Sequence, residues 1–227
     1  MKYLLDTANL DEIRELCEYL PIAGVTSNPS IVKKEGAIPF FAHMREIRSI
    51  IGNVRPLHIQ VTATDYDGMM RDVEAVFRHV DEKVYIKVPI DFAGVKVIKT
   101  LKRQGANVTA TAVYGMDQAF IALEAGADCI APYFNRMEAL GTDAASVVGN
   151  IAGIINHYGY ETEILAASFK QPTQIDRAIL AGAHSVTVAP DVLREVFAKK
   201  IVKDAVQAFS DDWSSLYGGK TLAELES

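Results

Sequence analysis

The sequence predicts an α/β fold: a single (β/α)8 TIM barrel with one extra helix at its C-terminal end. Short apolar segments alternate with amphipathic segments eight times along the 227-residue chain. The apolar segments have no polar face, which is typical of parallel strands that helices cover on both sides. Eight alternations favour a closed barrel formed by one domain over residues 1–227. A doubly wound sheet is the alternative, but no GxGxxG motif follows the first strand.

The first half of the chain carries four strand–helix units. Predicted strands cover residues 3–5, 23–26, 57–61 and 84–88. Polar residues suited to capping a helix follow each strand, and apolar residues then recur at helical spacing. The predicted helices start after Asn9 or Asp11, at Pro29 with a continuation over 40–51, after Asp65, and at about Phe92 with an end near Arg103.

The second half keeps the same order of elements. Predicted strands cover residues 107–113, 129–133, 163–168 and 184–188, and the first of these is rich in β-branched residues. Helices are predicted over 116–125, over 144–157, from Pro172 to about Gly182, and from Asp191.

An additional amphipathic segment follows the eighth unit. Its apolar residues recur every four positions, at Ile201, Ala205, Phe209, Trp213 and Tyr217. Because the barrel is complete before this point, the helix over 201–216 must cover either its own barrel or a neighbouring subunit. Both alternatives stay open here, and the large aromatic side chains make a subunit contact, and hence a homo-oligomer, one of the two hypotheses. Residues 218–227 are expected to form a flexible tail.

Composition excludes several classes of partner. The net charge of −6 gives no basic surface for nucleic acid, and no stretch approaches the roughly 18 apolar residues of a membrane span. Cys17 and Cys129 have no disulfide or metal-binding spacing, and the five histidines are scattered without HxH or HExxH spacing. We therefore expect a cytoplasmic protein with two free thiols, without a metal site and without a signal peptide.

Polar residues collect where the predicted strands end. In a (β/α)8 barrel these ends form one rim, and catalysis takes place there. Each polar residue has an ordinary structural explanation, such as a helix cap or a hydrogen-bonded core group. A single site explains all of them together: Asp6, Thr26, Asn28, Gln60, Lys87, Thr111, Tyr133 and Ser168.

Lys87 determines the chemistry that this rim supports. It is the one charged residue in an apolar strand, and burial of its ammonium lowers the pKa and favours the free amine. A neutral amine adds to a ketone or aldehyde and forms a Schiff base, whose protonated form withdraws electrons from an adjacent carbon–carbon bond. Asp6, Tyr133 and a water held by Gln60 and Thr111 are suitable proton donors and acceptors.

A second group of residues suits a phosphorylated substrate. Asn28 can hold a substrate hydroxyl group. Arg136, three residues after Tyr133, offers a planar guanidinium to a phosphate. Ser168 and Lys170 follow the seventh strand, where barrels of this kind often bind phosphate. The alternative for Arg136 and Lys170 is an ordinary solvated surface charge.

Six segments of the chain resemble the small transaldolase family, most closely its fructose-6-phosphate aldolase branch. The resemblance extends over nearly the whole sequence. Its motifs are Leu5-Asp6-Thr7, Gly24-Val25-Thr26-Ser27-Asn28-Pro29-Ser30, Ile86-Lys87-Val88-Pro89, Thr111-Ala112-Val113-Tyr114, Ala131-Pro132-Tyr133-Phe134-Asn135-Arg136 and Ala166-Ala167-Ser168-Phe169-Lys170.

The resemblance implies a role for most of the rim residues. It implies that Lys87 forms the Schiff base and that Asp6 is its acid/base partner. Thr26 and Asn28 would position the lysine and the substrate, and the implied phosphate site consists of Arg136, Ser168 and Lys170. It also implies pentameric rings that pair into decamers, with the C-terminal helix reaching a neighbour, and it implies no cofactor.

Gln60 and Tyr133 distinguish the two branches of the family. Transaldolases are expected to carry glutamate and phenylalanine there, whereas the aldolase branch carries glutamine and tyrosine. A phenol can protonate the enamine carbon, or position the water that does so, and dihydroxyacetone then leaves without an acceptor. One departure is Thr109-Ala110, where leucine-glycine is expected; a hydroxyl there is predicted to face the substrate and alter preference.

The sequence therefore predicts a cofactor-free class I aldolase. It would cleave or form a ketose such as fructose 6-phosphate, from dihydroxyacetone and glyceraldehyde 3-phosphate, through an imine on Lys87. Two alternatives stay open: a transaldolase of the pentose phosphate pathway that transfers the three-carbon unit to an aldose phosphate, and a non-catalytic barrel that binds phosphorylated metabolites.

Overall fold

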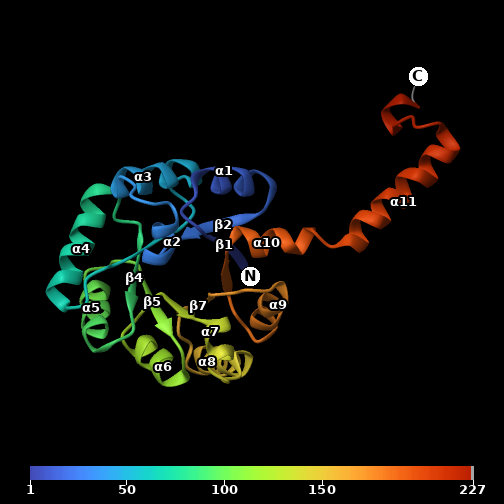
Figure 1. Ribbon diagram of the computed structural model, residues 1–227. Coiled ribbons are helices and arrows are strands. Elements are labelled where there is room, and N and C mark those ends of the chain that lie inside the picture. The colour runs from blue at the N-terminus through green and yellow to red at the C-terminus, as the bar shows by residue number, and fades with distance from the viewer. Residues whose placement is uncertain (226–227) are drawn as a thin grey trace.

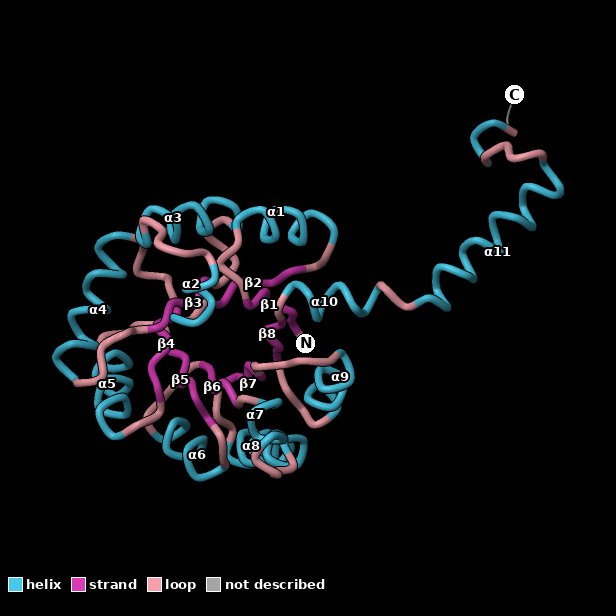
Figure 2. The backbone as a smooth tube through the Cα atoms, viewed as in Figure 1, coloured by secondary structure: helices cyan, strands magenta, loops and turns pink. Residues whose placement is uncertain are grey.

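Eight parallel strands close into one barrel in sequence order, as Figure 2 shows. The structure, a computed structural model, describes residues 1–225. Strand β1 pairs with both β2 and β8, which closes the ring and confirms the predicted (β/α)8 barrel. The strands are β1 (Lys2–Asp6), β2 (Ile22–Thr26), β3 (Leu57–Gln60), β4 (Tyr85–Pro89), β5 (Val108–Val113), β6 (Cys129–Pro132), β7 (Glu163–Ala166) and β8 (Ser185–Val188).

Helices surround the barrel on its outer side, as Figure 1 shows. Asparagine and aspartate side chains accept a backbone hydrogen bond at the start of five of the described helices, as the capping chemistry predicts. The helices are α1 (Leu10–Tyr19), α2 (Pro29–Lys34), α3 (Phe40–Ile51), α4 (Tyr66–His79), α5 (Phe92–Arg103), α6 (Met116–Glu124), α7 (Phe134–Ala139), α8 (Ala144–Tyr158), α9 (Pro172–Leu180), α10 (Pro190–Phe197) and α11 (Lys200–Tyr217), followed by a 3-10 turn over Leu222–Glu224.

The apolar core lies mainly between the strands and the helices. Ile86 and Val88 of β4 are fully buried in this core. Successive side chains of a strand point to opposite faces, so Lys87 between them points to the inside of the barrel. The same alternation brings Asp6 and Gln60 to the inside at the ends of their strands, where both line one cavity with Lys87.

The helix after β4 approaches the strand so closely that it needs a glycine. A Cβ atom at Gly94 would lie 1.9 Å from the carbonyl oxygen of Pro89. Asp91 caps the same helix and accepts a 2.7 Å hydrogen bond from the Gly94 amide. This packing fixes α5 against the end of the strand that carries Lys87.

Some elements differ from the sequence prediction. Helix α7 was not predicted, because it has six residues and its N-cap residue, Tyr133, makes no capping side-chain hydrogen bond. The seventh strand was predicted to reach Ser168 but ends at Ala166, since Ser168 has a left-handed backbone with φ of 64°. Helices α2 and α3 are separate elements, interrupted where Gly36 has a φ of 80°.

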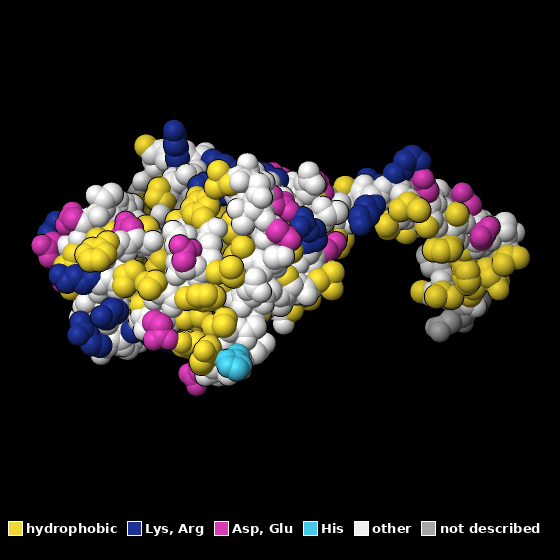
Figure 3. Space-filling view, turned by 90° about the horizontal axis from the view of Figure 1, so that it is seen from below, with side chains coloured by type: hydrophobic (Ala, Val, Ile, Leu, Met, Phe, Trp, Pro, Cys, Tyr) yellow, Lys and Arg dark blue, Asp and Glu magenta, His cyan; other side chains and the backbone are white. Residues whose placement is uncertain are grey.

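Helix α11 projects away from the barrel in Figures 1 and 3. It contains no buried residue, and Ile201 and Phe209 are 76% and 70% exposed. Figure 3 shows hydrophobic side chains gathered along this projecting segment. The prediction of a helix is confirmed, and the prediction that it packs on a neighbouring subunit stays a prediction.

The chain after α11, which was predicted to be a flexible tail, folds back on the end of this helix and contains a 3-10 turn. The Trp213 ring packs at a tilt against Tyr217 with ring centroids 4.5 Å apart, and its Nε1 donates a 2.6 Å hydrogen bond to the Lys220 carbonyl. Thr221 and Glu224 then form a capping box at the 3-10 turn. Positions 226 and 227 lie outside the described residues.

Candidate active site

Lys87 is the most deeply buried cation of the described residues. Its side chain lies in the barrel with only 3% of the residue exposed, and its Nζ donates a 3.1 Å hydrogen bond to the Ser27 carbonyl. Burial lowers the pKa of the Lys87 amine, and the Asp6 carboxylate opposes this shift. The lysine is therefore easier to deprotonate than a surface lysine, as the sequence indicates, which makes the amine available as a nucleophile.

Asp6 lies at the end of β1, next to the strand that carries Thr26. The Thr26 hydroxyl donates a 2.6 Å hydrogen bond to Asp6 Oδ1, and the Thr187 hydroxyl lies 2.6 Å from Thr26. Burial raises the pKa of Asp6, while Lys87, the Thr26 hydrogen bond and Lys34 act in the opposite direction. A carboxyl group with these opposing influences is suited to exchange a proton during a reaction.

Tyr133 and Thr111 form a pair on the opposite wall. Their hydroxyl oxygens lie 3.0 Å apart. Burial raises the pKa of Tyr133, so the phenol keeps its proton at neutral pH and can donate it. Gln60 Oε1 is buried and accepts no hydrogen bond from the described residues, so it is available to a substrate hydroxyl or to a water molecule.

Two residues with left-handed backbone lie in the cavity wall. Ala112 and Ser168 are the non-glycine residues with positive φ among the described residues, at 58° and 64°. Such conformations cost of the order of 1 kcal/mol or more and concentrate at functional sites. At Ala112 the pairing between β5 and β6 shifts register, and at Ser168 the chain leaves β7.

Helix α7 brings Arg136 beside Ser168. The amides of Phe134 and Asn135 donate to the carbonyls of Ala167 and Ser168, at 2.8 and 3.0 Å, which ties the start of α7 to the loop after β7. Arg136 Nη1 donates a 3.0 Å hydrogen bond to the Tyr114 hydroxyl, and its guanidinium carbon lies 5.1 Å from the centre of the Tyr133 ring.

Asn28 combines a structural role with a place in the cavity. Its Oδ1 accepts a 3.0 Å hydrogen bond from the Ile31 amide, which caps α2. The cap occupies the oxygen but leaves the Nδ2 amide group available as a donor to a substrate hydroxyl. The sequence left the cap and the binding role as alternatives, and the geometry is compatible with both.

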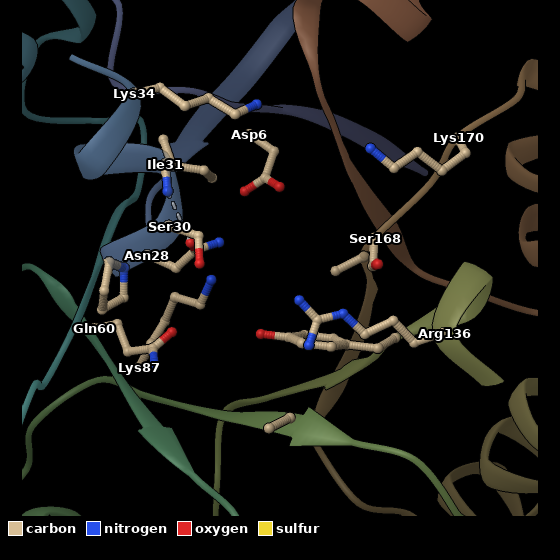
Figure 4. A pocket seen from close by; sticks show the side chains of 14 residues that line it. Asp6, Asn28, Ser30, Ile31, Lys34, Gln60, Lys87, Arg136, Ser168 and Lys170 are labelled. Carbon is tan, nitrogen blue, oxygen red and sulfur yellow. Dashed lines mark hydrogen bonds between the residues drawn. The ribbon is translucent and has the colours of Figure 1, made fainter. Parts of the chain in front are cut away.

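These side chains surround one cavity of about 490 Å³ at the C-terminal end of the strands (Figure 4). Thr26 and Thr111 are fully buried behind its wall and contact Asp6 and Tyr133. Figure 4 shows Lys34 and Asp6 across the cavity from Arg136. The other eight predicted site residues line it: Asp6, Asn28, Gln60, Lys87, Tyr133, Arg136, Ser168 and Lys170.

The cavity also contains residues that the sequence reasoning missed. Lys34 from the last turn of α2 and Ser30 from its first turn line the wall next to Asn28. Both belong to a helix that begins immediately after the Thr26 strand, and a helical reading of residues 29–34 could have placed them at the rim. Ala112, with its unusual backbone, had no signal in the sequence.

The cavity is strongly cationic in an acidic protein. It is lined by one carboxylate, Asp6, and by four basic side chains, although the chain has a net charge of −6. Such a cavity attracts an anionic ligand. The basic residues are Lys34, Lys87, Arg136 and Lys170. Within residues 1–225, no group of three His, Cys, Asp or Glu side chains is placed to hold a metal ion.

Comparison with known proteins identifies the family. The chain matches the family described as Transaldolase/Fructose-6-phosphate aldolase over residues 3–220. A probable fructose-6-phosphate aldolase from Streptococcus pneumoniae is 44% identical over 98% of this chain and 100% of its own length. Probable transaldolases from a Geobacillus species and from Petrotoga mobilis are each 36% identical, over 94% of this chain and 99% and 95% of their own lengths. The chain belongs to the transaldolase/fructose-6-phosphate aldolase family.

Membership of this aldolase/transaldolase family makes the chain an enzyme and confirms the resemblance read from its motifs. Sugar-phosphate substrates are consistent with the family and with the cationic cavity. None of the helices in the described part of the chain is long and apolar enough to cross a bilayer.

The prediction for Thr109, which stands where the resemblance led us to expect leucine, was wrong. It was expected to face the substrate, but it is fully buried and does not line the cavity. Its hydroxyl lies 2.9 Å from Nδ1 of His58, whose ring stacks on Tyr85 at 4.6 Å. Burial lowers the pKa of His58 to about 3, with Lys87 and Arg48 adding to the effect, so the imidazole is neutral in the barrel.

Proposed function

We propose that this enzyme is a class I aldolase that cleaves fructose 6-phosphate, and forms it in reverse, through an imine on Lys87. The observation that carries the proposal is the buried Lys87 amine, which shares one cavity with Asp6 and with the Arg136–Ser168 pair. These groups provide a nucleophile, a proton acceptor and an anion site within one sugar-sized space.

The first step is formation of the imine. The Lys87 amine adds to the C2 carbonyl of the ketose, and the carbinolamine loses water to give a protonated imine. Because burial lowers the pKa of Lys87, a larger fraction of the amine is neutral before the addition. The Ser27 carbonyl, which accepts a hydrogen bond from Nζ at 3.1 Å, aims the amine.

The second step breaks the bond between C3 and C4. Asp6 takes the proton of the C4 hydroxyl, the carbon–carbon bond breaks, and its electron pair moves into the protonated imine to give an enamine. Glyceraldehyde 3-phosphate is the aldehyde product. The hydrogen bond from Thr26 keeps Asp6 Oδ1 in place, while the other carboxylate oxygen is left for the substrate.

The third step releases dihydroxyacetone. C3 of the enamine receives a proton from the Tyr133 phenol, directly or through a water bound to the free Gln60 Oε1, and water then hydrolyses the imine. Thr111, 3.0 Å from the Tyr133 oxygen, orients the phenol. Release without an acceptor sugar is what distinguishes an aldolase from a transferase.

Arg136, Ser168 and Lys170 are the proposed phosphate site. The three side chains line the same side of the cavity (Figure 4). The Arg136 guanidinium offers paired donors to phosphate oxygens, and the Lys170 ammonium adds a second charge. Neither cation makes an ion pair with a carboxylate in the described part of the chain, and Arg136 uses one donor for the Tyr114 hydroxyl, so both keep donors for the substrate.

The deciding experiment supplies fructose 6-phosphate alone and measures free dihydroxyacetone, then repeats the assay with erythrose 4-phosphate. We expect release in the absence of an acceptor. Borohydride in the presence of dihydroxyacetone should trap an adduct on Lys87, and peptide mass spectrometry should locate it. Labelling of another lysine would overturn the assignment of Lys87.

A transaldolase is the second candidate, and the names of the Geobacillus and Petrotoga relatives favour it. It would use the same imine and enamine but pass the three-carbon unit to an aldose phosphate, as in the pentose phosphate pathway. Turnover only with erythrose 4-phosphate would establish it. A non-catalytic metabolite-binding barrel predicts no adduct at Lys87 in either assay.

We also propose that the enzyme is a homo-oligomer, a pentamer or a pair of pentamers, in the cytoplasm. The exposed apolar side chains of the projecting helix α11 support an intersubunit contact, and two unpaired thiols suit a reducing compartment. Light scattering should give a mass of five or ten chains. Phe209→Asp, on the exposed face, should lower that mass, whereas Gln207→Asp should not.

A further inference from the structure

Lys34 is a cavity residue to which neither the motifs nor the proposed reaction assigns a role. It occupies the last position of α2, and Figure 4 shows its side chain extending over the cavity toward the Asp6 side. Its ammonium group makes no hydrogen bond and no ion pair within 4 Å in the described part of the chain. Asp6 is the carboxylate that lines the same cavity, and Lys34 acts against the effect of burial on the pKa of Asp6.

Two cations of the cavity lower the pKa of Asp6, namely Lys87 and Lys34. Lys87, its strongest cationic partner, exchanges protons and forms a covalent bond, so its charge varies from step to step. Thr26 supplies a hydrogen bond but no charge. Lys34 is exposed to solvent and takes no part in the imine chemistry, so its charge is constant throughout.

We propose that Lys34 is a positioning residue that keeps the Asp6 carboxylate ionised while Lys87 passes between its amine, imine and enamine states. The inference rests on the proposed function in that it assigns Asp6 as the proton acceptor. Lys34 lies on the Asp6 side of the cavity (Figure 4), and its positive charge there favours the anionic carboxylate.

Other charged and titratable groups around the cavity also interact with Asp6. The Asp6 charge helps to raise the pKa of Tyr133, and Arg136 and Lys170 lie on the far wall. A change at Lys34 must therefore be compared with a protein in which all these groups are unchanged. The charged and titratable groups that share the cavity with Asp6 are Lys34, Lys87, Tyr133, Arg136 and Lys170.

The direct measurement is the titration of the Asp6 carboxyl carbon by NMR in the free enzyme, with Asp6→Asn identifying the signal. We expect Lys34→Ala to move the midpoint to higher pH, since removal of a cation disfavours the carboxylate. Lys34→Arg should restore the original midpoint. Lys33→Ala is the matched control: Lys33 is the neighbouring lysine of the same helix and does not line this cavity.

The kinetic measurement is the pH profile of kcat/KM for the aldol reaction of dihydroxyacetone with unphosphorylated glyceraldehyde. The acid limb should move to higher pH in Lys34→Ala and stay in place in Lys33→Ala. In the parent enzyme, about 1 M salt should reproduce part of the shift, because the Debye length falls to about 3 Å.

Two outcomes overturn the inference. An unchanged Asp6 titration in Lys34→Ala removes the electrostatic role. An acid limb that stays in place, together with a KM that rises only for phosphorylated substrates, would assign Lys34 to the phosphate site instead. Failure of the proposed function looks different: no adduct forms on Lys87 and no dihydroxyacetone is released, while the Asp6 titration still reports on Lys34.

Discussion

The Lys87 amine and the Ser27 carbonyl are joined by a 3.1 Å hydrogen bond inside the barrel. Ser27 is buried and directly precedes Asn28, the N-cap of α2, the helix that ends at Lys34. The end of one strand therefore aims the proposed nucleophile and starts the wall that faces Arg136. Asp6 and Tyr133 line the same cavity as this amine.

Lys87→Met should abolish the borohydride-trapped adduct and lower kcat by at least about a thousandfold. The thermal midpoint should stay the same or rise, because the variant no longer buries an ammonium group and methionine fills a similar volume. Peptide mass spectrometry and calorimetry check the two parts. A variant that unfolds would not test the chemistry, so Lys87→Arg, which keeps the charge, serves as the second variant.

Tyr133→Phe should reduce the release of dihydroxyacetone from fructose 6-phosphate more than the transfer of the unit to erythrose 4-phosphate. The phenylalanine keeps the ring but removes the proton donor to the enamine. Thr111→Val should have a smaller effect in the same direction, since the Thr111 hydroxyl lies behind the cavity wall, 3.0 Å from the Tyr133 hydroxyl. Equal losses in both assays would contradict a specific role in release.

Arg136→Ala should raise KM for fructose 6-phosphate by about 10- to 100-fold, the effect of losing a charge-assisted contact to phosphate. The reaction of dihydroxyacetone with unphosphorylated glyceraldehyde should change little. Steady-state kinetics with both substrates measure the difference. Arg78→Ala, which removes an exposed arginine of α4 away from the cavity, is the control; a uniform loss with both substrates would argue against a phosphate contact.

The buried His58 should make the fold less stable in acid. Its pKa is about 3 in the folded state and ordinarily about 6.5, so between these values the unfolded chain binds more protons. Stability should therefore fall as the pH decreases from about 6.5 to about 3, by up to about 1.4 kcal/mol per pH unit from this residue.

Urea unfolding at a series of pH values measures the slope. His58→Leu should flatten it even if the variant is less stable overall, because it loses the contact with Thr109. His157→Gln, at an exposed histidine of α8, should leave the slope unchanged. An equally steep decline in His58→Leu would assign the acid sensitivity to other groups.

Local sequence signals predicted the strand–helix order well. Helix α5 has the predicted bounds and α3 ends at the predicted residue, and Asp65 and Asp91 cap their helices through side-chain hydrogen bonds. Such signals act within a few residues, so they can be read from the chain. Helix α7 was not predicted because hydrogen bonds to the loop after β7, which is far away in the sequence, stabilise it.

The sequence by itself determined the closed barrel and the lysine in its fourth strand, because periodicity and strand-end position follow from neighbouring residues. Strand-end position also indicated eight of the residues that line the cavity, whereas only the tertiary structure decided the others. It placed Lys34 beside Asp6 and turned Thr109 toward His58, away from the substrate side. The reason is physical: strand register, helix tilt and left-handed turns arise from contacts between distant segments, and these set where each side chain points.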